Sequence, residues 1–218
     1  MTDDQRRLDR DVAGAAAAHQ RLLTHLDERE AVASNRPSKL PGWTVGHVLT
    51  HLARNADSHV RMLEGAERGE VVDQYVGGAE GRERDIEQGS TRPWGELADD
   101  VRRSIWALEQ KWAAHGDWAG EARRVSGTLI PVSDLPFARW RETEVHHVDV
   151  GLEYKSFDWP GEYVREDLRR MEILWNARRP MGMTGLPPAA LQAPPHERLA
   201  WLLGRVELDD LAPAGIFG

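Results

Sequence analysis

Apolar residues recur at steps of three and four along much of the chain, which is the spacing of one buried face of an α-helix. The pattern predicts four long helices, over about residues 3–30, 44–65, 93–114 and 134–154. The last three are expected to begin near a capping hydroxyl or a first-turn proline, namely Thr44, Pro93 and Ser133. Four long helices with connections of uneven length predict a four-helix bundle and a mainly all-α fold class.

The connections between these helices contain residues that break regular structure. Residues 66–92 are Gly-rich and charged, with a possible short helix near 82–87. Residues 118–132 predict either an extended connection or a short hairpin. We therefore expect any β-structure in this part of the chain to be small.

A change of composition at KSFDWPGE ends the predicted bundle. We predict a first domain over residues 1–157 and a second, small C-terminal α(+β) region over residues 158–218. Within the second region, the apolar spacing predicts helices over about 162–178 and 196–205, separated by a Pro- and Gly-rich stretch.

Composition and charge restrict the class of protein. The 218 residues carry a net charge of −8 without a basic block, so nucleic acid is not an expected partner. No apolar run approaches a membrane span and the first residues have no apolar signal segment, so we expect a cytoplasmic protein without a membrane partner. The chain has no cysteine, so thiol chemistry would need a thiol from outside.

The second predicted helix carries histidines beside its apolar face. At about 100° per residue, His51 lies roughly 110° from the centre of that face, and His47 points more nearly outward. Asn55 and His59 continue the side of His51 toward the core. The face itself is formed by Val45, Val48, Leu49 and Leu52.

The fourth predicted helix has a denser set of titratable groups. Glu142, His146, Asp149 and Glu153 share one stripe along the flank of its apolar face. Glu142 and His146 are four residues apart and lie one above the other, so they can reach one ion together. Glu144 and His147 fall on other sides of this helix and are expected to meet solvent or a neighbouring element.

His51, Glu142 and His146 together form a set of two imidazoles and one carboxylate. Three protein ligands that leave one position open are typical of catalytic zinc sites, and the same donors also accept Mn, Fe, Co or Ni. The alternative is a weak surface ion pair between Glu142 and His146, which is common at this spacing. His19 is expected to be a core histidine, and the remaining histidines considered are expected at the surface: His25, His115 and His196.

The segments LPGWTVGHVLTHLARNA and RWRETEVHHVDVGL resemble the mycothiol-dependent maleylpyruvate isomerase family, within the DinB-like metalloenzyme superfamily. YVGGAEGRERDIEQG and LAWLLGR extend the resemblance over most of the chain. It implies a DinB-like four-helix bundle and a divalent metal, usually zinc, held by His51, Glu142 and His146. It also implies a smaller C-terminal domain, which looks shortened here. Arg205 matches an arginine that the family uses in catalysis, and Arg82 is a further candidate, as a cofactor-binding anion clamp.

The activity implied by the resemblance is isomerisation of maleylpyruvate to fumarylpyruvate with mycothiol. A metal-bound thiolate would add to the double bond, the resulting single bond would rotate, and elimination would give the trans product. The partners would be a small-molecule thiol and a small dicarboxylate or other electrophile. Two alternatives stay open, a mycothiol S-transferase and a non-catalytic metal-binding module.

Overall fold

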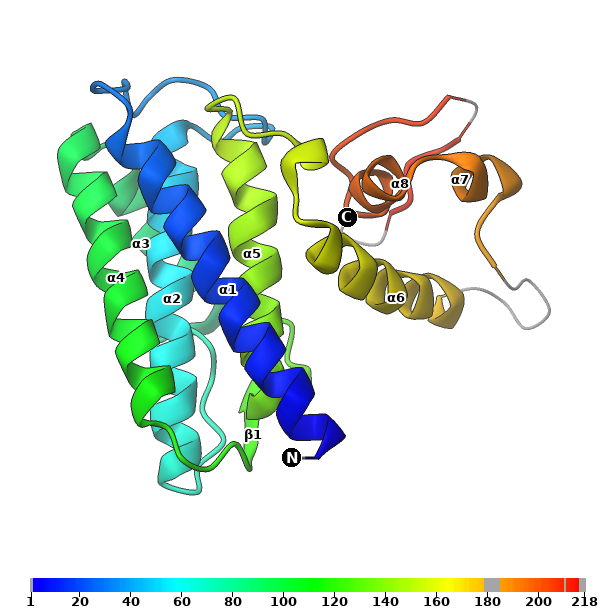
Figure 1. Ribbon diagram of the computed structural model, residues 1–218. Coiled ribbons are helices and arrows are strands. Elements are labelled where there is room, and N and C mark those ends of the chain that lie inside the picture. The colour runs from blue at the N-terminus through cyan, green and yellow to red at the C-terminus, as the bar shows by residue number, and fades with distance from the viewer. Residues whose placement is uncertain (1, 179–184, 210, 216–218) are drawn as a thin grey trace. The chain divides into compact units, whose positions relative to one another are not determined.

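The computed structural model describes residues 2–178, 185–209 and 211–215. The chain forms two compact units, Met1–Glu153 and Tyr154–Gly218. The first unit contains the helical bundle shown in Figure 1. In the described part of the chain, no helix is both long enough and apolar enough to cross a bilayer.

Four long helices form the bundle, as the apolar spacing predicts: α1 (Asp3–Asp27), α2 (Val45–Glu67), α4 (Trp94–Ala114) and α5 (Leu135–Val150). Helix α2 packs against both α4 and α5, and α1 packs against both α5 and α4. The apolar faces of these helices meet in a core whose fully buried members include Leu22, Val48, Leu49, Leu52 and Val101. Burial of this apolar surface is the main term that holds the bundle together.

A fifth helix, α3 (Gly78–Ser90), lies beside α2 and is longer than the short helix predicted near residues 82–87. Its end touches the start of α2, because a Cβ atom at Gly46 would lie only 1.8 Å from the carbonyl oxygen of Ser90. Of the two forms expected for residues 118–132, the short hairpin is the one observed, as the antiparallel strands β1 (Glu121–Arg123) and β2 (Leu129–Pro131).

The helix ends differ in how well the sequence predicts them. Thr44 is the N-cap of α2, as expected, and His47 Nδ1 accepts from its backbone N–H at 3.2 Å. The predicted cap at Ser133 is wrong: a 3₁₀ turn over Val132–Asp134 comes first, and Asp134 is the N-cap of α5. Helix α5 ends at Val150 because Gly151 takes a left-handed conformation, with φ +76°.

The C-terminal unit is helical in its described residues. It contains a 3₁₀ turn over Ser156–Asp158 followed by α6 (Gly161–Ala177), α7 (Pro188–Gln192) and α8 (Pro195–Leu202). Helix α6 packs against α8, and the rings of Trp175 and Trp201 lie 5.2 Å apart between them. The described strands all belong to the first unit, so the predicted β contribution to this region is not found in its described residues.

Candidate metal centre

The structure brings His51 from α2 together with Glu142 and His146 from α5. Their ligand atoms all lie within 4.8 Å of one another. Glu142 Oε2 is 3.0 Å from His51 Nε2 and 3.4 Å from His146 Nε2, so the carboxylate lies between the two imidazoles. The His51 side chain is buried, whereas about one-third of the Glu142 side chain (33%) is exposed. The group is therefore partly open on the carboxylate side.

The three groups hold one another in distinct charge states. Burial, with a smaller contribution from the nearby His146, lowers the pKa of His51 to about 4, so His51 is neutral at pH 7. Burial alone would raise the pKa of Glu142, but hydrogen bonds from both histidines outweigh it and hold that pKa well below its usual range. Burial would lower the pKa of His146, but its bonds to Asp149 and Glu142 raise it.

The carboxylate of Asp149 lies beside the second imidazole. Its Oδ2 atom lies 2.9 Å from His146 Nδ1, and the Asp149 side chain is fully buried one turn along α5. A proton on Nδ1 that is donated to a carboxylate leaves Nε2 as the atom that can bind a cation. The expectation that Asp149 lies on the same stripe as His146 is confirmed by this contact. Glu153 lies beyond the end of α5, where it pairs with Arg29, so its predicted place on the stripe is wrong.

Arg82 of α3 lies against the first imidazole. Its Nη2 atom is 3.3 Å from His51 Nδ1, and its guanidinium lies 5.6 Å from the centre of the Trp43 ring. A guanidinium can only donate, so this contact needs a lone pair on Nδ1 and a proton on Nε2. A cation bound at Nε2 requires the opposite tautomer of His51. If His51 held a cation at Nε2, Arg82 could no longer donate to Nδ1, and its donors would be available to an anion.

The donor set fits a divalent cation. Two imidazole nitrogens and one carboxylate oxygen converge from two helices, and a buried carboxylate supports one of the imidazoles. Imidazole and carboxylate donors suit zinc and several other divalent metals equally. That His51, Glu142 and His146 hold a metal stays a prediction.

Glu144 and His147 are buried on another side of α5, where they meet α1. Glu144 pairs with Arg21, and His147 Nε2 lies 2.8 Å from His25 Nδ1. Burial lowers the pKa of His147 to about 3, with a further contribution from His25. Of the two expected environments, solvent or a neighbouring element, the second is the one observed.

The other histidines divide between correct and wrong predictions. His19 is a fully buried core residue, as expected, bonded to Glu109 at 2.8 Å. His115 is not at the surface, because only 6% of it is exposed and its Nδ1 lies 2.8 Å from Glu67. His25 and His196 are half-buried, and His196 donates to the Trp159 carbonyl at 2.9 Å.

The sequence pattern does not predict one buried polar residue of the bundle interior, Arg139. Arg139 is fully buried and donates to His19 Nε2, to the Leu52 carbonyl and to Asn55 Oδ1, each at 2.9 Å. Burial lowers its pKa to about 10. The feature of the sequence that could have indicated this location is its position three residues before Glu142 on the same helix. These hydrogen bonds of Arg139 link α5 to α1 and α2.

Arg205, the predicted catalytic residue, belongs to the C-terminal unit. It follows α8, where its backbone N–H donates to the Ala200 carbonyl at 2.8 Å and its Nη1 donates to the Leu203 carbonyl at 2.7 Å. Its role in catalysis stays a prediction.

The helical bundle brings two imidazoles and a carboxylate within reach of one ion. The chain belongs to the family described as the mycothiol maleylpyruvate isomerase N-terminal domain, whose family model matches residues 12–151.

Two solved structures share this fold. One is a crystal structure of the mycothiol-dependent maleylpyruvate isomerase, and the other is a histidine-to-alanine variant of that isomerase. Each is 22% identical to this chain, with a TM-score of 0.81 over 94% of this chain and 93% of the other. No curated protein matches the sequence.

Proposed function

We propose that this protein is a metal-dependent enzyme that converts maleylpyruvate to fumarylpyruvate with mycothiol as the thiol co-substrate. In this reaction the thiol sulfur adds to the cis double bond and the carbanion formed is stabilised as an enolate. The bond, now single, rotates. Expulsion of the sulfur then restores the double bond in the trans form, so no thiol is consumed.

The convergence of His51, Glu142 and His146 is the observation that carries this proposal. Glu142 and His146 lie 91 and 95 positions after His51 in the sequence, on a different helix. Their ligand atoms and that of His51 nevertheless fall within 4.8 Å of one another. Membership of a family named for a maleylpyruvate isomerase supports the choice of reaction. The absence of cysteine from the chain agrees with a thiol that comes from outside.

A bound divalent cation supplies a Lewis acid that keeps a coordinated thiol in the thiolate form at neutral pH. The chain's own residues orient and balance this centre. Asp149 fixes the orientation of His146, and Glu142 contributes one negative charge. Arg82, once it leaves His51 Nδ1, offers positive charge to a carboxylate of the substrate or to the developing enolate. Arg205 is proposed to stabilise the same enolate.

The direct test supplies the purified protein with zinc, mycothiol and maleylpyruvate, and follows the cis and trans forms by proton NMR together with the free thiol. We expect the trans product to accumulate while the thiol concentration stays constant. Consumption of one thiol per electrophile would identify an S-transferase instead. No conversion of this or any other electrophile with zinc and mycothiol present would favour a non-catalytic metal-binding module.

The metal ligands are tested separately by metal analysis of four purified variants. We expect Glu142→Ala and His146→Ala to lose most of their bound metal, whereas Glu144→Ala and His147→Ala should keep it. The second pair is a matched control, because both residues are buried on the same helix and face α1. Equal loss of metal in all four variants would contradict the assignment.

A further inference from the structure

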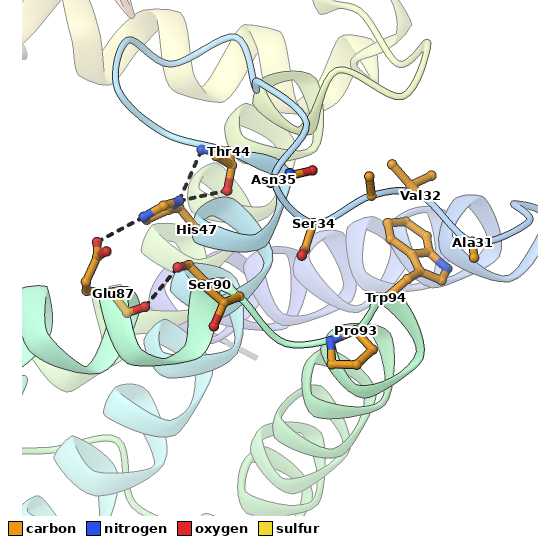
Figure 2. A pocket seen from close by; sticks show the side chains of 12 residues that line it. Ala31, Val32, Ser34, Asn35, Thr44, His47, Glu87, Ser90, Pro93 and Trp94 are labelled. Atoms are coloured by element: carbon orange, nitrogen blue, oxygen red, sulfur yellow. Dashed lines mark hydrogen bonds and ion pairs between the residues drawn. The ribbon is translucent and has the colours of Figure 1, made fainter.

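A groove of about 730 Å³ lies at the start of α2, outside the metal centre. It is bounded by the connection after α1, the first turn of α2, the end of α3 and the start of α4. Figure 2 shows Ser34, Asn35, His47, Glu87 and Trp94 around it. The groove lies wholly within the first unit.

The walls of this groove combine hydrogen-bonding groups with one large aromatic surface. The Ser34 hydroxyl and the Asn35 side chain have no side-chain partner among the described residues, and the connection that bears them is fixed by a bond of 2.9 Å from Gly46 N to the Ser34 carbonyl. Trp94 is half-buried against the rim of the core, so part of its ring stays available in the groove. Amide, hydroxyl and indole groups together suit a ligand with many hydroxyls and apolar C–H faces.

The charge of the groove excludes a strongly anionic ligand. None of its lining residues is a lysine or an arginine. Its one carboxylate, Glu87, accepts from His47 Nε2 at 3.1 Å. Because His47 Nδ1 already accepts from the Thr44 N–H at 3.2 Å, the His47 proton lies on Nε2 and the ring is the neutral donor. The groove therefore favours an uncharged, hydroxyl-rich ligand over a phosphate or a free carboxylate.

The groove lies close to the metal centre along α2. His47 and His51 are four residues apart on neighbouring positions of one helix face, about 6 Å along the axis. The Trp43 ring packs against both of them, with centroid distances of 6.1 Å to His47 and 5.6 Å to His51. A second hollow of about 430 Å³ shares His47 and Glu87 with the groove and includes Trp43. The groove thus lies about one helical turn from the metal centre, with the Trp43 ring between His47 and His51.

We infer that this groove binds the polyhydroxylated part of the thiol co-substrate. The inference rests on the proposed function, which places the thiol sulfur at the metal centre. Mycothiol carries its thiol on a cysteinyl unit joined to glucosamine and inositol, and this sugar–cyclitol part is rich in hydroxyls. The Trp94 ring packs against a C–H face of this part, while Ser34, Asn35 and Glu87 bond to its hydroxyls. The groove thus selects the thiol, whereas the metal centre performs the chemistry.

The kinetic test compares mycothiol with N-acetylcysteine, a thiol that lacks the sugar and the cyclitol. In Trp94→Leu and in Asn35→Ala we expect KM for mycothiol to rise about tenfold, with kcat and metal content within about twofold of the wild type. The kcat/KM for N-acetylcysteine should not change. The matched control is Trp106→Leu, because Trp106 lies on the same helix but is 64% exposed and outside the groove. An unchanged KM for mycothiol in both groove variants, or an equal loss with both thiols, would overturn the inference.

A binding measurement separates this inference from the proposed reaction. The zinc-loaded protein is titrated with N-acetylglucosaminylinositol, which has no thiol and no free amine, and binding is followed by NMR. We expect saturable binding that weakens about tenfold in Asn35→Ala, a variant of an exposed residue that should fold normally. Binding by a protein that isomerises nothing would leave the groove assignment standing without the isomerase. Isomerase activity without this binding would refute the groove and leave the isomerase.

Discussion

Replacement of Asp149 tests how the metal centre is built, because Asp149 reaches the ion only through His146. Its buried carboxylate lies 2.9 Å from His146 Nδ1, where its negative charge favours a proton on that nitrogen and leaves Nε2 free to bind. Asp149→Asn keeps the size of the side chain and one oxygen acceptor but removes the charge. Supporting residues of this kind typically change metal affinity by 10–100-fold, so we expect zinc binding to weaken by about 1.4–2.7 kcal/mol.

The assay is a competition titration of zinc against a chromophoric chelator, with circular dichroism to confirm folding. The control is Asp100→Asn, because Asp100 is also a buried carboxylate of the bundle. Asp100 pairs with Arg54 at 2.9 Å and Arg92 at 2.7 Å, away from the metal centre. We expect the control to keep wild-type affinity within about twofold. Wild-type affinity in folded Asp149→Asn, or the same loss in both variants, would refute the supporting role of Asp149.

Three further predictions concern catalysis, pH and packing. Arg205→Ala should retain zinc but lose most turnover of maleylpyruvate, and full activity would remove Arg205 from the mechanism. Burial lowers the pKa of His19 from 6.5 to about 4, so the unfolded chain takes up the proton first as pH falls. The contribution of His19 to the free energy of unfolding is complete above about pH 6.5 and is lost toward pH 4, by roughly 3 kcal/mol. Urea unfolding measured across this pH range should show a smaller loss of stability in His19→Gln than in the wild type. Gly46→Ala should destabilise the fold by about 1–3 kcal/mol or more in the same assay, because the new Cβ would lie 1.8 Å from the Ser90 carbonyl oxygen. Gly95→Ala is the control and should not destabilise the fold, because a Cβ there would meet nothing within 4 Å.

The sequence predicts the bundle and the candidate ligands well because both depend on one periodicity. The angle between residues on a helix follows directly from their spacing, so Glu142 and His146 have to share a stripe wherever α5 packs. Because His51 lies beside the apolar face of α2, its imidazole points toward the interior of the bundle. These local rules need no knowledge of which helix is the neighbour.

The predictions that fail depend on neighbours or on single residues at helix ends. His115 looks like a surface group in the sequence, but Glu67 of α2 and the ring of Trp118 cover it in the fold. The helical spacing predicts that Glu153 continues the stripe, but Gly151 ends α5 two residues earlier. Arg139 lies in an apolar interior that sequence patterns do not assign to an arginine, and its three acceptors come from two other helices.

The crowding of titratable groups on α5 follows from its place in the bundle, because α5 packs against both α1 and α2. On the side toward α2, Glu142 and His146 converge with His51. On the side toward α1, Glu144 pairs with Arg21 and His147 with His25, so groups that could compete for an ion are already bonded. A buried group that is paired costs little, whereas an unpaired one costs several kcal/mol. The pairing with α1 therefore stabilises the fold and keeps the polar groups on that side of α5 separate from the candidate metal ligands.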